Sequence, residues 1–249
     1  MQVGFIGSGN MAAALARGWG EPVLCTDSGS GRARALAEEL GGEAVGNREL
    51  AERADLVVLA HKPAQLADVA AEIAGTAKAV VSILAGKTQA DLRAAYPDTP
   101  VFCLEPNTPV EVGRGTLALA EPDAPVDEEL HAAVRERFAR LGAVIDVPER
   151  LMPVAGACSG VAPAYWALLV EAWVDAAVRR GMPAATAQEL VIGGMAGTAE
   201  LLRRHEGDTL MVRRAVASPG GSTARGLAAL EAAGVRAALS QAMDEVMEA

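Results

Sequence analysis

Over the first 147 residues, short apolar runs alternate regularly with segments of helical periodicity. The apolar runs have the length of strands and lie at 2–6, 22–26, 56–60, 79–84, 101–104 and 143–147. The helical segments lie at 11–19, 32–40, 64–74, 88–95 and 126–141. Strands that alternate with helices of this length predict right-handed crossovers and a mostly parallel sheet with helices on its faces.

The strand pattern stops after residue 147, and only helical segments follow. They lie at about 149–157, 161–180, 184–204, 208–216 and 223–247. We therefore expect an α/β plus all-α fold, with an α/β domain at 1–147 and a helical domain at 148–249. Glu171 and Asp175 interrupt the apolar stretch 161–178, which we interpret as a buried helix and not as a membrane span.

The helical domain is expected to form a dimer. The chain is 51% apolar but 3% aromatic, so its helices are covered mainly by Ala, Leu and Val. So much small apolar surface makes a poor monomeric domain. Gly193, Gly194 and Gly197 fall in one helical segment, where glycine costs about 1 kcal/mol relative to Ala and is tolerated when another backbone comes close.

Charge and cysteine usage narrow the class of partner. A net charge of −10 disfavours nucleic acids and anionic membranes, so a small molecule is the expected ligand. Cys25, Cys103 and Cys158 are scattered and form no CxxC or Cys/His cluster, which predicts neither disulfides nor a metal site. With no export signal recognised, we expect a cytoplasmic protein.

The six residues after the first strand, Gly7-Ser8-Gly9-Asn10-Met11-Ala12, form a glycine-rich turn that opens a helix. The first glycine permits a tight turn, and the second lets the backbone approach a pyrophosphate at the helix N-terminus. Such a hexapeptide is a weak signal alone, but here it lies in the required strand-turn-helix context. The α/β domain is therefore predicted to be a Rossmann-like dinucleotide-binding domain.

The choice between NAD and NADP stays open. Asp27 lies 20 residues after Gly7 at the end of the second strand, where a carboxylate binds the ribose 2′-hydroxyl of NAD. Arg32 and Arg34 follow in a flexible turn and are able to pair with the 2′-phosphate of NADP. Asp27 is also a suitable cap for the next helix.

Six segments, taken in order and spacing, resemble the pyrroline-5-carboxylate reductase family. They are IGSGNMAAALARG (6–18), LAHKP (59–63), SILAGKT (82–88), EPNTP (105–109), SGVAPAY (159–165) and SPGGST (218–223). The last is the most specific. The resemblance covers essentially the whole chain and implies a Rossmann domain followed by a helical dimerisation domain. The implied activity is reduction of a cyclic imino acid, 1-pyrroline-5-carboxylate, to proline with NADH or NADPH.

The resemblance also implies roles for individual residues. The pyrophosphate would be held by Gly7, Ser8, Gly9, Asn10 and Met11. The rest of the cofactor would be lined by Ala60, Lys62 and Pro63 and, near the nicotinamide, by Ser82, Ala85 and Gly86. Asn107 would position the substrate ring, and Ser218, Gly221 and Ser222 would hold its carboxylate.

Thr223 is the expected catalytic group at the imine nitrogen, since hydride transfer to C=N is faster when that nitrogen is protonated. Thr223 is equally suited to cap the last helix. A nest of backbone N–H groups and hydroxyls at 220–223 can bind a carboxylate without an arginine clamp.

Several positions depart from the family pattern. Glu105 stands where the family usually has Met before PNTP, and Val161-Ala162 replace a Ser-Gly pair. Glu105 either faces the site as a second catalytic group or forms a salt bridge with an arginine at the dimer surface. These departures keep open a reductase for another cyclic imine, with a six-membered or sulfur-containing ring.

Two further functions carry less weight. A hydroxyacid dehydrogenase of similar layout needs a lysine in its helical domain, but Lys62, Lys78 and Lys87 all lie in the α/β domain. A non-catalytic dinucleotide-binding protein would have no need of the SPGGST loop.

Overall fold

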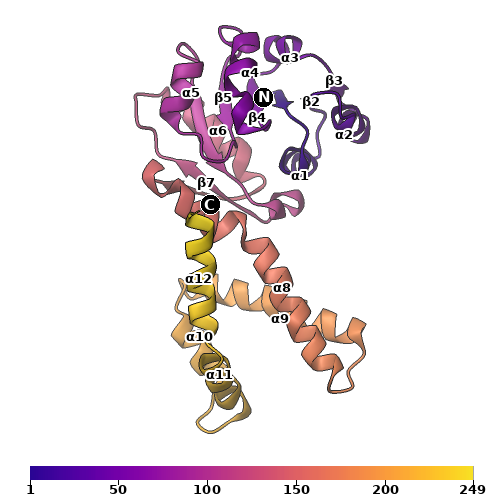
Figure 1. Cartoon of the computed structure of the whole chain (residues 1–249), viewed down its shortest axis with the longest axis vertical. Coiled ribbons are helices and arrows are strands. Elements are labelled where there is room, and N and C mark those ends of the chain that lie inside the picture. Colours follow the sequence, from indigo (N-terminus) through magenta and orange to yellow (C-terminus); the bar gives the residue numbers. More distant parts are fainter. Residues whose placement is uncertain (249) are drawn as a thin grey trace. The chain divides into compact units, whose positions relative to one another are not determined.

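The structure is a computed structural model that describes residues 1–248 (Figure 1). Contacts within the chain divide it into two compact units, one of Met1–Pro163 and one that begins at Ala164. The colours of Figure 1 follow the sequence from indigo at the N-terminus through magenta and orange to yellow at the C-terminus.

The first unit is built on one sheet. Its strands are β1 (Val3–Ile6), β2 (Leu24–Thr26), β3 (Glu43–Ala44), β4 (Leu56–Leu59), β5 (Val80–Ser82), β6 (Val101–Glu105), β7 (Gly115–Ala120) and β8 (Gly142–Val147). Their order is β3-β2-β1-β4-β5-β6-β7-β8. The strands from β3 to β6 are parallel, so the predicted parallel sheet is confirmed. The strand order reverses direction beside β1, which is where ligands bind in folds of this type.

Strand β7 was not expected from the sequence, and it changes the far side of the sheet. It pairs with β6 in antiparallel fashion and with β8 in parallel fashion. The short connection through the 3-10 helix η2 (Thr108–Val112) leaves no room for a crossover helix, so β7 must return antiparallel to β6.

Helices cover both faces of the sheet and bury an aliphatic core. On one face lie α1 (Asn10–Trp19), α2 (Arg32–Leu40) and α6 (Glu128–Ala139). On the other lie α3 (Asn47–Arg53), α4 (Leu66–Ile73) and α5 (Gln89–Ala95). Every residue of β4 is buried, which is typical of a central parallel strand.

A small aromatic cluster links α1 to α6. The ring centroid of Trp19 lies 5.9 Å from that of Phe5 and 5.2 Å from that of Phe138. The indole N–H of Trp19 donates to the backbone carbonyl of Arg137 at 3.0 Å, and the Arg137 guanidinium stacks over the indole. Each aromatic pair is worth about 0.5–1.5 kcal/mol beyond its buried area.

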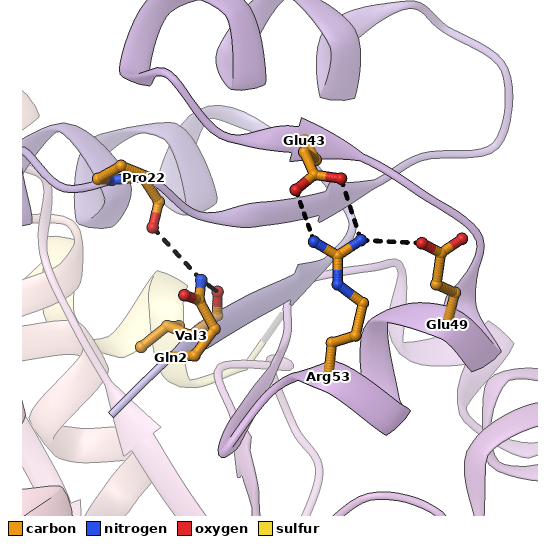
Figure 2. Close-up of polar contacts among 6 residues, drawn as sticks. All are labelled: Gln2, Val3, Pro22, Glu43, Glu49 and Arg53. Atoms are coloured by element: carbon orange, nitrogen blue, oxygen red, sulfur yellow. Dashed lines mark hydrogen bonds and ion pairs between the residues drawn. The ribbon is translucent and has the colours of Figure 1, made fainter.

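Strand β3 and helix α3 close the edge of the sheet, and neither was expected from the sequence. Arg53 of α3 donates to both carboxylate oxygens of Glu43 in β3, at 2.6 and 3.0 Å, and to Glu49 at 2.8 Å (Figure 2). At the start of the interior strand β1, the side-chain amide of Gln2 donates to the carbonyls of Val3 and Pro22. The Arg53 pairing spans separate elements, so local periodicity does not reveal it.

A helical run with a π-turn leaves the first unit. It comprises the 3-10 turn η3 (Glu149–Leu151), helix α7 (Met152–Ala155), π-helix η4 (Gly156–Gly160) and α8 (Ala162–Val178). By length and composition alone this run, Glu149–Val178, is able to cross a membrane, which is weak evidence.

The second unit has almost no core of its own. Its further helices are α9 (Ala184–Arg204), α10 (Thr209–Val216), α11 (Ser222–Ala232) and α12 (Val235–Met247). Among the described residues from 164 onward, Ala187 alone is a buried hydrophobic residue, whereas Trp166 and Trp173 are 53% and 67% exposed. The expectation that 161–178 is buried is therefore wrong for the single chain, because no second layer covers α8.

The helix expected at 223–247 is two helices. The chain breaks after α11 at Ala233 and Gly234, and Gly234 adopts a left-handed φ of 78° that glycine tolerates at no steric cost.

We predict that Gly18→Ala destabilises the first unit. A Cβ at Gly18 would lie 2.2 Å from the carbonyl oxygen of Val110 and 2.8 Å from Leu141, so α1 would have to move off η2. Overpacking costs about 1–3 kcal/mol, which exceeds the roughly 1 kcal/mol that Ala gains in helix propensity. A thermal melt should show a lower Tm, while Gly46→Ala, which meets open space, should change Tm little. An unchanged Tm for Gly18→Ala would contradict this packing.

Candidate active site

The turn between β1 and α1 is held by a close backbone approach. Gly7 has a φ of 97°, and a Cβ there would lie 2.6 Å from the carbonyl of Ala60 and from the amide nitrogen of His61. Only glycine satisfies both conditions. Gly9 is the N-cap of α1 and provides no side-chain cap, and a Cβ placed there would meet no atom within 4 Å. The first N–H groups of α1 are thus left for an anion.

A cleft of about 660 Å³ opens beside this turn, at the carboxyl ends of β1, β2 and β4. Seven of the expected cofactor residues line it: Gly7, Ser8, Gly9, Asp27, Ala60, Lys62 and Pro63. The others do not line it: Asn10 and Met11 begin α1, while Ser82, Ala85 and Gly86 lie at the end of β5 and in the turn after it. Sequence reasoning missed several lining residues, among them Thr26, Asn47 and Gln65.

Asp27 organises the loop between β2 and α2. Its carboxylate accepts hydrogen bonds from the backbone N–H of Ala33 and Gly29, both at 2.8 Å, and from the hydroxyl of Ser30 at 2.9 Å. The Ala33 and Gly29 bonds hold the pKa of Asp27 below its usual value. Asp27 therefore serves the capping role considered from the sequence while it lines the cleft, and Arg32 lines the cleft beside it.

Asn47 joins the cleft to α4. Its side-chain oxygen accepts from the Thr26 hydroxyl at 2.6 Å, and its amide nitrogen donates to Glu72 at 2.9 Å. No signal in the sequence marked Asn47, because its place depends on α3 packing beside β2. His61, also in the cleft wall, has its Nδ1 2.9 Å from the carbonyl of Lys62, and burial lowers its pKa.

The end of β6 carries Glu105 and, two residues later, Asn107. Asn107 is 7% exposed, and its side-chain oxygen accepts from the backbone N–H of Thr116 at 2.8 Å. Its amide nitrogen donates to the hydroxyl of Ser159 at 3.1 Å. These bonds tie the strand end to η4. The Glu105 carboxyl lies against Gly156 and Gly160 of η4, and burial raises its pKa.

The SPGGST loop lies in the second unit, just before α11. Gly220 has a φ of 69°, and a Cβ on Gly221 would lie 2.5 Å from the Ser218 hydroxyl. The N–H of Gly221 donates to the carbonyl of Ser218 at 3.0 Å. The loop is thus a tight turn that brings Ser218 beside the start of α11.

Thr223 is not the N-cap of α11. The N-cap is Gly221, which has no side-chain cap bond, and Ser222 and Thr223 are the first two helical residues. A Cβ at the cap position would displace the Ser218 hydroxyl and would lie 3.1 Å from the Ser218 carbonyl oxygen, so glycine leaves room there for the Ser218 side chain. Arg225, which the sequence did not single out, donates to the carbonyl of Gly220 at 2.6 Å and braces the loop.

Within residues 1–248 no group of three or more His, Cys, Asp or Glu side chains is placed to hold a metal ion. The cleft offers a glycine-rich turn and a helix N-terminus, which is the chemistry of a phosphate site.

We predict that Gly7→Ala weakens dinucleotide binding. The added methyl meets backbone atoms, and the left-handed φ costs about 1–3 kcal/mol in addition, so the turn must shift away from the pyrophosphate position. Titration by fluorescence should show Kd for NADH or NADPH raised roughly 10-fold or more. Gly75→Ala is the matched control, because Gly75 has a φ of 78° but open space around it and lies outside the cleft. An unaltered Kd for Gly7→Ala would show that this turn does not hold the cofactor.

Two family models match the chain. Residues 2–86 match the model for NADP oxidoreductase, coenzyme F420-dependent, and residues 149–249 match the model for pyrroline-5-carboxylate reductase dimerisation. The first covers the glycine-rich turn and the cleft, and the second covers the SPGGST loop.

Relatives and solved structures extend the similarity to the whole chain. Pyrroline-5-carboxylate reductase of Synechocystis sp. is 39% identical over 79% of this chain and 74% of the relative. That of Thermus thermophilus is 36% identical over 98% of this chain and 95% of the relative. The 1-pyrroline-5-carboxylate reductase of Streptococcus pyogenes superposes with a TM-score of 0.89 at 30% identity and covers 100% of this chain and 97% of that chain. A Plasmodium falciparum pyrroline carboxylate reductase with NADP bound superposes with a TM-score of 0.87 at 26% identity and covers 100% and 96%. This chain therefore belongs to the pyrroline-5-carboxylate reductase family.

Proposed function

We propose that the chain reduces 1-pyrroline-5-carboxylate to proline with NADH or NADPH. The observation that carries the proposal is the joint presence of the glycine-rich cleft and the SPGGST loop in a chain that aligns with reductases of that name over nearly its whole length. Glu105, which is partly buried and has a raised pKa, favours a second candidate, a reductase for a different cyclic imine on the same scaffold.

The cleft fits a nicotinamide dinucleotide. At Gly7 the backbone leaves no room for a side chain, and at Gly9 the space beside the backbone is open. A turn of this kind lets the backbone approach a pyrophosphate. Bound there, the cofactor supplies a hydride. The pyrophosphate is held by Gly7, Ser8, Gly9, Asn10 and Met11. The adjoining part of the cofactor is held by Asp27, Ala60, Lys62 and Pro63, and the nicotinamide is bordered by Ser82, Ala85 and Gly86. Asp27 and Arg32 set the choice between NAD and NADP.

The SPGGST loop holds the substrate carboxylate. The first N–H groups of α11 have no partner within the helix, and Ser218, Gly221 and Ser222 surround that position with hydroxyls and a bare backbone. Thr223, one residue into the helix, reaches the imine nitrogen with its hydroxyl. The side-chain amide of Asn107 is already hydrogen-bonded to Thr116 and Ser159. Asn107 therefore positions the substrate ring indirectly, by fixing the end of β6.

The chain associates with itself through its helices. Residues 149–249 match a dimerisation model, and α8 leaves large apolar side chains exposed. We further propose that residues 148–249 form one dimerisation and substrate domain, that α8 packs on a second copy and not in a bilayer, and that the protein is cytoplasmic.

The purified protein should oxidise NADH or NADPH when 1-pyrroline-5-carboxylate is added, and it should sediment as a dimer or a multiple of one. A panel of cyclic imines assayed with both cofactors by absorbance provides the measurement. Turnover of a six-membered or sulfur-containing imine, with none of pyrroline-5-carboxylate, would replace the first candidate by the second. A folded monomer in dilute solution would contradict the self-association.

The Thr223→Val and Ser222→Ala variants should fail in different ways. Loss of a hydroxyl that acts at the nitrogen in the transition state should lower kcat by roughly 10- to 1000-fold. Loss of a hydroxyl that holds the carboxylate equally in ground and transition states should raise KM and leave kcat nearly unchanged. Because Thr223 is not the helix cap, its variant should keep the wild-type Tm. Steady-state kinetics at saturating cofactor measure both effects, and wild-type kcat in Thr223→Val would remove Thr223 from the reaction.

A further inference from the structure

Glu105 lies at the edge of the sheet on which the cofactor cleft opens. It is the last residue of β6, and two residues before it Cys103 pairs with Ser82 of the parallel strand β5. At about 3.3 Å per residue, Glu105 therefore stands roughly 7 Å beyond the level of Ser82 in the direction of the carboxyl edge. That edge is shared with the ends of β1 and β4, which carry the glycine-rich turn and Ala60.

The helix opposite Glu105 has no side chains at the point of contact. A Cβ on Gly156 or on Gly160 would lie 3.3 Å from Oε1 of Glu105, so any larger residue would press on the carboxyl. Both glycines belong to the π-helix η4, in which the N–H of Val161 reaches back five residues to the carbonyl of Gly156. Single π-turns inside α-helices are frequent at functional sites.

A partly buried group of hydrogen-bonded side chains, the Asn107–Ser159 clasp, holds η4 in this position. Ser159 lies between the two glycines. Its hydroxyl accepts a hydrogen bond from the side-chain amide of Asn107 and donates one to the backbone carbonyl of Thr116 at 3.3 Å. Asn107 in turn accepts the N–H of Thr116. These hydrogen bonds join the end of β6, which carries Glu105, to β7 and to η4. On the β6 side they are made by Asn107, which lies two residues from Glu105.

The Glu105 carboxyl has no compensating partner within residues 1–248. Burial raises its pKa, with no hydrogen bond or charge opposing the effect. Among the elements packed against it, η4 carries Cys158 as its one titratable side chain, which is exposed, and β5 and β7 carry none. By contrast, the carboxylate of Asp27, which is partly buried like Glu105, receives three hydrogen bonds. An unpaired carboxyl is costly to bury, and such groups concentrate at functional sites.

Reduction of an imine consumes a proton as well as a hydride. The hydride adds to the carbon of C=N, and the nitrogen must end with a new N–H bond. The Thr223 hydroxyl can orient the nitrogen by a hydrogen bond but is too weak an acid to give up its proton on its own. A carboxylic acid is among the side chains that serve as a general acid.

We propose that Glu105 is the general acid that delivers this proton to the ring nitrogen, and that the Asn107–Ser159 clasp is what positions it. This inference rests on the proposed function. In the step, the O–H bond of the Glu105 carboxylic acid breaks and an N–H bond forms on the ring, while the hydride adds to the neighbouring carbon. The carboxylate left behind takes a proton from solvent, which restores the acid.

The test is the pH profile of kcat for wild type and Glu105→Gln. Because its pKa is raised, Glu105 keeps its acid form to higher pH than an exposed glutamate, so wild-type kcat should fall as pH rises through that pKa. Glu105→Gln should lower kcat by roughly 10- to 1000-fold and abolish that limb of the profile, with KM for the cofactor unchanged. Glu111→Gln is the matched control, since Glu111 is exposed and pairs with Arg17, and it should keep the wild-type profile.

Ser159→Ala tests the clasp. With the hydroxyl gone, η4 loosens and the Glu105 carboxyl becomes more exposed, so the descending limb of the profile should move to lower pH while kcat falls less than in Glu105→Gln. A merely structural role for Ser159 would lower Tm without moving that limb.

Thermal melts provide a readout that does not need activity. The folded protein binds the Glu105 proton more tightly than the unfolded chain, so Glu105 lowers stability as pH rises through its raised pKa. Glu105→Gln should remove that loss and should not melt below wild type at neutral pH. Wild-type kcat and an unchanged pH limb in Glu105→Gln would overturn the inference and leave the proposed function standing. Failure of the wild type to reduce any cyclic imine would overturn both, even if the melts confirm the buried carboxyl.

Discussion

The contact of Gly7 with the backbone of Ala60 and His61 is the constraint on which the site depends. A turn with a left-handed φ at that position lets β1 pass directly into α1 while β4 lies alongside, with 2.6 Å between a hypothetical Cβ and the next strand end. Any side chain would push α1 away from the sheet and remove the helix N-terminus from the cleft. Because the strand order turns at β1, the same contact places the cleft between the ends of β1, β2 and β4.

Polar residues around the cleft serve the fold as much as the ligand. Asp27 and Asn107 both have acceptors engaged by backbone N–H groups, and Asn47 bridges Thr26 to Glu72. A loop at the edge of a parallel sheet has backbone groups that no strand satisfies, so side chains must satisfy them. Glu105 is the exception among these residues, because its partly buried carboxyl lies against two glycines and receives no donor within the described chain.

The two units differ in how far they bury their own apolar side chains. The first unit covers both faces of its sheet and buries large side chains such as Phe5, Leu15 and Phe138 completely. In the described part of the second unit, the helices expose Trp166, Trp173 and many leucines, so their stability depends on another surface. The SPGGST loop leads into one of these helices and falls within the residues that match the dimerisation model.

Local patterns in the sequence determined the parallel strands, the glycine-rich turn, the helices after residue 147 and the family. Hydrophobic periodicity, turn residues and short motifs each depend on a few neighbouring residues. Tertiary structure alone decided the rest. Strands β3 and β7 are defined by pairing with the neighbouring strands of the sheet and not by a local pattern, and Asn47 reaches the cleft because α3 packs beside β2. Thr223 looked equally suited to cap a helix, yet the turn of the chain at Ser218 places Gly221 in that position and leaves Thr223 inside the helix. The partial burial of Glu105 depends on two glycines more than 50 residues away. Close packing between segments that are distant in the sequence produces no periodic pattern from which it could be predicted.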